Sequence, residues 1–234
     1  MIGRNIHIIP SPFPLVRGRG IKGDRVNKSC ISCMENVTIK AVKEKLRQAL
    51  SRRQKRHIID ASLVPSAVLL PIYYKQGQCH ILFTKRTGKV KEHKGEISFP
   101  GGAYEDGDRT LIDTALRECA EEIGLAAEAV ELLGELDDML TIGTGYIMSP
   151  FVGAIPWPYP LKLDPTEVEE IIEVPISALL DKDCLLQGTD TIDGQVVTTY
   201  FYHYRGKVIW GATARILNQF LDIYTRVMKN TGSK

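Results

Sequence analysis

The sequence predicts an α/β fold that combines several β-strands with a central and a C-terminal amphipathic helix. Residues 111–123 carry apolar side chains at helical spacing, and Gly124 follows where a glycine commonly ends a helix. Residues 66–75 and 79–85 are strand-like runs, and the Gln-Gly-Gln turn between them predicts a β-hairpin. Residues 212–228 again show helical spacing. The length of 234 residues suits one domain with appendages.

The N-terminal part of the chain is predicted to divide in two. Residues 1–33 are rich in Pro, Gly and Arg with little periodicity, so we expect extended or poorly ordered chain there. Thr38 is expected to cap a basic helix that runs to about Arg53. Its apolar stripe favours a helix docked on the domain over one that binds nucleic acid. The folded domain is therefore predicted to span residues 34–234.

The remaining elements are short and alternate toward the C-terminus. Strands are predicted at residues 96–99, 131–140, 149–155 and 167–174, a short helix at 176–180, and a hairpin of residues 195–204 and 208–210. Cys79 and Cys119 lie in apolar patterns and are expected in the core.

Composition and charge narrow the functional classes. The apolar content of 44% and charged content of 25% are typical of globular proteins, and no apolar run approaches the roughly 18 residues of a membrane span. Five cysteines without regular spacing indicate reduced thiols, so a cytoplasmic protein is expected. Residues 1–58 hold 14 of the 30 Lys and Arg but only 3 of the 28 Asp and Glu. We interpret this as a solvated basic segment, with nucleic-acid binding as the less favoured alternative. The pattern specifies no oligomeric state.

One edge of the central helix concentrates negative charge. Glu118, Glu121 and Glu122 fall on an arc about 100° wide, beside an apolar arc of roughly 140°. Like charges at these spacings repel each other, and a hard divalent cation with oxygen ligands would turn that repulsion into binding. Arg117 precedes the cluster and is able to pair with a carboxylate. Three glutamates alone are more often a solvated acidic edge, so the flanking residues decide between the two interpretations.

Those flanking residues resemble the Nudix hydrolase signature, which runs Gly, five residues, Glu, seven residues, Arg-Glu-apolar-any-Glu-Glu-any-Gly-apolar. The stretch from Arg117 to Leu125, RECAEEIGL, matches the second half throughout, with Cys119 at the apolar position. The first half departs from the signature. Asp108 stands six residues after Gly102 in place of Glu, and eight residues rather than seven separate it from Arg117.

A second stretch resembles the coenzyme A pyrophosphatase branch of the Nudix hydrolases. The run LFTKR at residues 82–86, then Gly95, then FPGG at residues 99–102 follows the extra signature of that branch with the same spacing. The departures are Phe83 for Leu, Thr87 for a smaller residue and Lys91 for Arg. The alternative for these cations is an exposed basic loop.

The resemblance implies a fold and a metal site. The fold is a Nudix-type α/β/α sandwich with a mixed β-sheet, preceded here by an N-terminal extension and helix. Mg²⁺ or Mn²⁺ would be held by Glu118 and Glu122, with Glu121 as a third ligand or acting through a water. Arg117 would orient the carboxylates. Gly101 and Gly102 would let the backbone approach the metal or ligand, with a carbonyl of Gly101 as a further ligand.

The resemblance also implies a substrate site. Lys85, Arg86 and Lys91 are candidates for phosphate contacts. The general base stays open between the helix and the later residues Glu167, Glu169 and Glu170.

The predicted function is divalent-metal-dependent hydrolysis of the pyrophosphate bond in coenzyme A or acyl-coenzyme A, giving phosphopantetheine and adenosine 3′,5′-bisphosphate products. The expected partner is a small-molecule nucleotide similar to coenzyme A; no membrane partner is expected, and a nucleic acid is the less favoured partner. One alternative is another Nudix substrate, such as ADP-ribose, a dinucleoside polyphosphate, an oxidised nucleotide or capped RNA. The other is a non-catalytic nucleotide sensor or RNA-binding module on the same fold.

Overall fold

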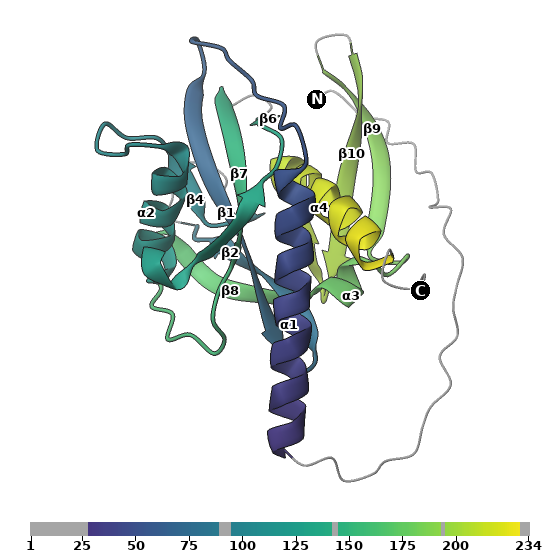
Figure 1. The fold of residues 1–234 in the computed structure, drawn as a ribbon. Helices are drawn as coiled ribbons and strands as arrows, with labels where there is room; N and C mark the ends of the chain where they lie inside the picture. The colour runs from purple at the N-terminus through teal and green to yellow at the C-terminus, as the bar shows by residue number, and fades with distance from the viewer. Residues whose placement is uncertain (1–27, 89–94, 142–144, 193–194, 230–234) are drawn as a thin grey trace.

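A computed structural model describes residues 28–88, 95–141, 145–192 and 195–229. The architecture is layered, with helices on both faces of a mixed β-sheet (Figure 1). Helix α2 (Leu111–Ile123) covers one face, and helices α1 (Lys28–Ser51) and α4 (Gly211–Lys229) lie on the other side. This arrangement confirms the predicted α/β class and the mixed sheet.

The main sheet is organised around strand β1 (Val64–Lys75), which has both parallel and antiparallel neighbours. It pairs antiparallel with β2 (Gln78–Arg86) and parallel with β7 (Tyr146–Ala154). The other strands of this sheet are β3 (Ile97–Ser98), β4 (Gly101–Ala103), β5 (Glu131–Glu135), β6 (Met139–Leu140) and β8 (Val168–Pro175). Strand β4 is antiparallel to β1, which brings Gly101 and Gly102 opposite Val68 and Ala67.

Alternation along the strands divides the core between the two faces of the sheet. On the α2 side, Leu69 and Leu82 pack with Cys119 of the helix. On the α1 and α4 side, Leu70 and Ile81 belong to a larger cluster that includes buried residues of both helices. Because the side chains of successive strand residues point to opposite faces of the sheet, adjacent residues pack into different hydrophobic clusters. Cys79 and Cys119 are both buried, as predicted.

A second, three-stranded sheet lies beside α4. It consists of β9 (Leu185–Ile192), β10 (Gln195–Tyr204) and β11 (Lys207–Ile209), all antiparallel. The hairpin of β10 and β11 was predicted, and β9 was not. Its sequence, LLQGTDTI, has a glycine and no sustained apolar alternation, so pairing with β10 defines it as a strand. Two short elements complete the chain, the 3₁₀ turn η1 (Ala127–Ala129) and helix α3 (Ile176–Leu179).

Two boundaries differ from those predicted. Helix α1 begins at Lys28 rather than at Thr38, so the predicted division between residues 33 and 34 falls inside a helix. The predicted strand 131–140 is split into β5 and β6, because Asp137 and Asp138 turn into polar contacts between them. Asp137 accepts hydrogen bonds from Arg53 and Gln219, and Asp138 accepts one from Ser149. The division into residues 1–33 and 34–234 stays a prediction, and residues 1–27 lie outside the described residues.

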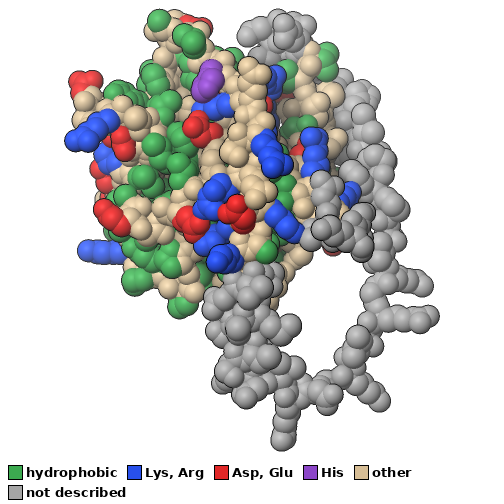
Figure 2. All heavy atoms as spheres, viewed as in Figure 1, with side chains coloured by type: hydrophobic (Ala, Val, Ile, Leu, Met, Phe, Trp, Pro, Cys, Tyr) green, Lys and Arg blue, Asp and Glu red, His purple; other side chains and the backbone are tan. Residues whose placement is uncertain are grey.

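Helix α1 is docked on the domain by its apolar stripe. Val42, Leu46 and Leu50 are buried, and Leu50 packs against the backbone at Gly134. Lys43 and Arg47 both form salt bridges with Glu131 of β5. On the face that α1 crosses, Lys and Arg side chains are interspersed with Asp and Glu (Figure 2). Of the described helices, none is long and apolar enough to cross a membrane.

Replacement of Leu46 by Ala should therefore destabilise the whole domain. Leu46 is fully buried in the core shared by α1, α4 and the sheet, so truncation leaves a cavity and costs about 3 kcal/mol of unfolding free energy. Chemical denaturation would measure this loss, with the exposed Lys40→Ala as control, expected within about 0.5 kcal/mol of wild type. A Leu46→Ala protein as stable as wild type would contradict the docking of α1.

Candidate active site

Helix α2 begins and ends at residues whose side chains and backbone favour those positions. Thr110 is extended and its hydroxyl accepts a hydrogen bond from the backbone N–H of Asp113. Gly124 adopts the left-handed conformation with φ 67° and donates to the carbonyls of Ala120 and Cys119. Between these caps, Ala115, Cys119 and Ile123 are fully buried against the sheet. The apolar face therefore fixes the rotation of the helix, and Glu118 and Glu122 lie at its buried flank.

Glu122 is a buried carboxylate with an unsatisfied oxygen. Its side chain is 3% exposed, and Oε2 has no hydrogen-bond partner among the described residues. The backbone N–H of Gly101 donates to this carboxylate, and Nη1 of Arg86 lies 3.7 Å from Oε1. Buried polar atoms normally have partners, so an orphaned carboxylate oxygen indicates a site built for a cation or ligand.

The pKa of Glu122 is raised to about 8, chiefly by burial, with the nearby carboxylates adding to the rise and the charge of Arg86 opposing it. Burial also raises the pKa of Glu118, with Arg117 acting against the rise. Two adjacent carboxyls whose pKa values are raised, chiefly by desolvation and further by nearby carboxylates, are characteristic of functional sites.

Glu118 lies directly against the backbone of Gly102. A Cβ at residue 102 would stand 2.5 Å from Cδ of Glu118, so only glycine leaves room for this carboxylate. The side chain of Glu118 is 14% exposed, and its Oε1 accepts from Nη1 of Arg117 at 3.0 Å. Both glycines thus lie close to the glutamates: Gly102 is next to the Glu118 side chain, and the Gly101 N–H donates to Glu122.

Arg117 contacts one carboxylate that precedes the helix and two that lie on it. Its Nε and Nη2 donate to the two oxygens of Asp108 at 3.0 and 3.1 Å, and Nη2 also reaches the carbonyl of Ala103. Nη1 donates to Glu118 and Glu121, each at 3.0 Å. Glu121 differs from the other two glutamates, because its side chain is 59% exposed. Asp108, which departs from the signature, is therefore the anchor of Arg117.

Asp108 should make the stability of the domain depend on pH in the acid range. Hydrogen bonds from Arg117, with others from Glu105 N–H and Thr114, lower the pKa of this buried carboxyl to about 2. Its stabilising contribution is present above the unfolded pKa of about 4 and is lost as the pH falls toward 2. Asp108→Asn should lower the unfolding free energy by about 1–2 kcal/mol at pH 6, and the difference from wild type should narrow below pH 4. Urea titrations at a series of pH values test this, and a constant difference would contradict it.

The two adjacent cations of the LFTKR run do not share one phosphate site. Arg86 lies on the α2 side beside Glu122, and its buried Nε has no partner among the described residues. Lys85 points to the opposite face, where it pairs with Glu169 at 2.7 Å and Glu170 at 3.7 Å. Strand alternation separates them, and the ladder with β8 shifts register between these residues. Lys91 lies outside the described residues.

The three later glutamates are separated in the same way. Glu169 and Glu170 accept from lysines, with Glu170 also bound to Lys207 at 2.5 Å. Burial chiefly raises the pKa values of Glu118 and Glu122, and the charge of Glu167 adds to the rise of each. No sequence pattern distinguishes the three, because their different surroundings depend on the path of the chain before β8.

The donor set fits a hard divalent cation held by few protein ligands. Within the described residues, no group of three His, Cys, Asp or Glu side chains is arranged to hold a metal ion, and Glu121 turns outward. Mg²⁺ binds through one or two carboxylates and completes its shell with waters and substrate phosphates. Glu118 and Glu122, with an orphaned oxygen on Glu122, match that requirement.

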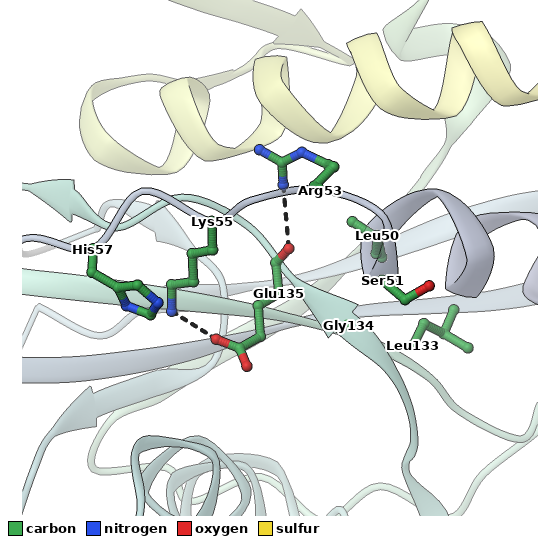
Figure 3. A pocket seen from close by; sticks show the side chains of 8 residues that line it. All are labelled: Leu50, Ser51, Arg53, Lys55, His57, Leu133, Gly134 and Glu135. Atoms are coloured by element: carbon green, nitrogen blue, oxygen red, sulfur yellow. Dashed lines mark hydrogen bonds and ion pairs between the residues drawn. The ribbon is translucent and has the colours of Figure 1, made fainter.

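Two cavities formed by described residues lie away from these glutamates. One of ≈ 220 Å³ is formed between the end of α1 and β5, and Figure 3 shows Arg53 and Lys55 both directed at Glu135 there. Lys55 donates to Glu135 Oε2 at 2.7 Å, and Arg53 donates to the backbone carbonyl of Glu135 at 3.3 Å. The two cations that line this cavity therefore already have partners within the protein. A second, of ≈ 440 Å³, adjoins β6 and α4. Neither is lined by a residue of the predicted active site.

Comparison with known proteins identifies the family. The NUDIX domain matches residues 63–192. A protein of Photorhabdus laumondii named uncharacterized Nudix hydrolase NudL is 38% identical over 154 residues, which cover 66% of this chain and 81% of that protein. A protein of the same name from Klebsiella pneumoniae is 33% identical over 178 residues, covering 74% and 88%. The crystal structure of a MutT/nudix family protein from Enterococcus faecalis superposes with a TM-score of 0.50 at 14% identity, covering 88% of this chain and 76% of that one.

The matched family model covers the helix that carries Glu118 and Glu122, the two glycines above it and most of the mixed sheet. The chain belongs to the Nudix family. It is a Nudix pyrophosphohydrolase of a nucleotide derivative, and hydrolases of this family typically use a divalent metal ion.

Proposed function

We propose that the protein hydrolyses the pyrophosphate bond of coenzyme A or an acyl-coenzyme A. The observation that carries the hydrolytic part is the pair Glu118 and Glu122 beneath Gly101 and Gly102, with Arg86 alongside. The substrate class rests on the spacing of the LFTKR run, Gly95 and the FPGG run, which resembles the coenzyme A branch. In support of it, the first run contributes Arg86 and the last contributes both glycines to one site.

Each residue has a role in handling a polyanionic substrate. Glu118 and Glu122 would hold Mg²⁺ or Mn²⁺, which when bound neutralises phosphoryl charge and lowers the pKa of water. Arg86 offers a planar cation to a phosphate oxygen, and its unpartnered Nε is available for a second hydrogen bond. Arg117 keeps Glu118 in place by bonding it to Asp108 through one guanidinium. Lys85, held by Glu169 and Glu170, is assigned no phosphate contact, whereas Lys91 stays a predicted one.

A side-by-side hydrolysis assay with coenzyme A and ADP-ribose tests the proposal. Products are identified by mass with and without added Mg²⁺ or Mn²⁺, and ¹⁸O-labelled water shows which phosphorus is attacked. We expect metal-dependent formation of phosphopantetheine and adenosine 3′,5′-bisphosphate, with kcat/KM for coenzyme A above that for ADP-ribose. A kcat/KM for ADP-ribose higher by tenfold or more would overturn the substrate assignment. Tight binding without metal-dependent turnover would instead indicate a nucleotide sensor.

A further inference from the structure

A row of apolar side chains crosses the neighbouring strands β4, β1, β7 and β6 at one end of the main sheet. Tyr104 directly follows β4, and its N–H donates to the carbonyl of Pro65 in β1 at 2.9 Å. Pro65 lies opposite Ile147 of β7, and Ile147 lies opposite Leu140 of β6. These four residues therefore form one cross-strand row, which we call the apolar row.

The apolar row lies on the face of the sheet that carries α2. Ala67, two residues after Pro65, packs in the cluster beneath α2, and side chains two residues apart along a strand share a face. Gly102 lies opposite Ala67, so the glycine beside Glu118 belongs to the adjacent row on the same face. At the end where they begin, β1 and β7 project beyond α2 (Figure 1). The apolar row is thus next to the glycines, at the uncovered end of this face.

The row is exposed although it is apolar. Tyr104 is 37% exposed and Leu140 is 42% exposed, Pro65 is also exposed, and Ile147 is nearly buried beside it. The Tyr104 hydroxyl donates to the carbonyl of Asp108 at 2.6 Å, which leaves the ring as the free surface. A single exposed apolar residue is ordinary, but contiguous apolar surface beside a polar site is what a ligand with an apolar part would contact.

The two sides of the glycine pair differ in charge. On the β2 side, Arg86 lies 3.7 Å from Glu122 and has a buried Nε without a partner among the described residues. On the β7 side lies the apolar row, which contains no charged residue. An acyl-coenzyme A has the same asymmetry, because its phosphates and its acyl chain are at opposite ends of the molecule. The site matches such a molecule in the orientation that places the nucleotide phosphates toward Arg86.

The length of the row also fits this ligand. Adjacent strands lie about 4.8 Å apart, so the three steps from β4 to β6 span about 14 Å. About twelve bonds separate the phosphate ester oxygen of coenzyme A from its sulfur, and an extended chain of that length, equal to about four residues, spans roughly 14 Å. A pantetheine arm that starts at the glycines therefore brings the thioester close to Leu140.

A second copy of the chain is a poorer match for this surface. A stable interface buries about 800 Å² of each partner, and four side chains offer far less. The apolar surface does not widen along the strands, because Ser149, opposite Ala67, donates its hydroxyl to Asp138 at 2.7 Å in the neighbouring row. An apolar strip one residue wide suits a chain-like ligand.

We propose that the apolar row binds the pantetheine arm of an acyl-coenzyme A and that the acyl chain begins near Leu140. The chain then continues onto Ile58 and Met139, which line the cavity of ≈ 440 Å³ together with Leu140. This inference rests on the proposed hydrolysis of coenzyme A derivatives and deepens it, because it makes the acyl derivative the preferred substrate. Apolar contacts far from the reacting phosphorus stabilise ground state and transition state alike, so they lower KM and leave kcat unchanged.

Steady-state kinetics on acetyl-, butanoyl- and hexanoyl-coenzyme A test the role of the row. Each added CH₂ on an open apolar surface should raise kcat/KM about twofold, half the free energy of complete burial, so the hexanoyl substrate should exceed the acetyl substrate by about tenfold, through KM. Leu140→Ser should reduce this ratio to about threefold or less and leave kcat/KM for acetyl-coenzyme A within about threefold of wild type.

Leu132→Ser is the matched control. Leu132 is 43% exposed in β5 of the same sheet but lies outside the row, so this variant should keep the ratio of about tenfold. Isothermal titration calorimetry in the presence of EDTA, which prevents metal-dependent turnover, gives a second readout. Hexanoyl-coenzyme A should bind about tenfold more tightly than acetyl-coenzyme A to wild type and Leu132→Ser, and at most about threefold more tightly to Leu140→Ser.

The possible outcomes separate this inference from the proposed function. Wild type without dependence on acyl length, or Leu140→Ser that keeps the dependence, would overturn the role of the row, as would equal losses in Leu140→Ser and Leu132→Ser. The expected calorimetric differences without metal-dependent turnover would support the row and overturn the proposed hydrolysis. Coenzyme A derivatives that neither bind nor react would overturn both.

Discussion

Glu122→Gln is expected to lower kcat by about 1,000-fold or more while the domain stays folded. The substitution keeps the size of a side chain that is 3% exposed, but removes the charge that a divalent cation and Arg86 would meet. The orphaned Oε2 has no structural partner to lose among the described residues, and the amide oxygen of a glutamine can still accept from the Gly101 N–H. Burial also raises the pKa of Glu122 to about 8, which means that folding carries a cost to keep this group ionised. Removal of the charge should therefore leave the melting temperature equal to or above that of wild type.

Glu121→Gln is the matched control for this prediction. Glu121 is one residue away on the same helix, but its side chain is 59% exposed and contacts Arg117 at the surface. Its substitution should change kcat by less than about fivefold, since exposed ion pairs contribute little. Steady-state kinetics and thermal unfolding on both variants give the comparison. Equal losses of activity in the two variants would show that Glu121 also contributes to catalysis, as the Nudix resemblance implied.

Gly102→Ala is expected to lower kcat/KM by about 100-fold with little change in stability. The new Cβ would stand 2.5 Å from Cδ of Glu118, so the flexible carboxylate must move away from its place beside Glu122. Its movement costs the fold little, because the atoms displaced are the end of a side chain. A shift of about 1 Å in a catalytic group is sufficient for a loss of this size.

Gly101→Ala is the comparison variant, and we expect it to lower stability, whereas Gly102→Ala lowers activity. Gly101 has φ 151°, and a Cβ there would stand 2.6 Å from the backbone Cα of Val68 in β1. Strand backbone cannot move aside as a carboxylate can, so we expect a loss of about 3 kcal/mol in unfolding free energy. If Gly102→Ala were to unfold the protein and Gly101→Ala to leave it stable, the packing of the glycines would be the reverse of that described.

Local patterns were sufficient for the elements that their own sequence defines. Helix α2 occupies residues 111–123 as predicted, because its apolar face and its terminal glycine are both contained within the stretch. The first hairpin also followed prediction, since Gln76 and Gly77 both adopt positive φ in its turn. Strand β9 was missed because its pairing with β10, and not its own residue pattern, makes it a strand. The start of α1 was predicted too late because the helix extends on the N-terminal side of Thr38, the expected cap.

The site was predictable in its helix and not in its surroundings. Helical spacing places three glutamates on one edge, but the contact with β4 decides that Glu118 and Glu122 are buried and Glu121 is not. Adjacent cations looked equivalent in the sequence, and the strand separates Lys85 from Arg86. The hydrogen bonds of Thr87 and Asp164 that fix the path of the chain before β8 join segments far apart in the sequence, so no local signal reveals them.

The most direct test of the site is a titration of the protein with Mn²⁺ alone, followed by electron paramagnetic resonance. The structure predicts that wild type and Glu121→Gln bind the ion with affinities within about threefold of each other, while Glu118→Gln and Glu122→Gln bind it at least about tenfold more weakly. Indistinguishable affinities in all four proteins would show that the buried glutamate pair does not hold the metal.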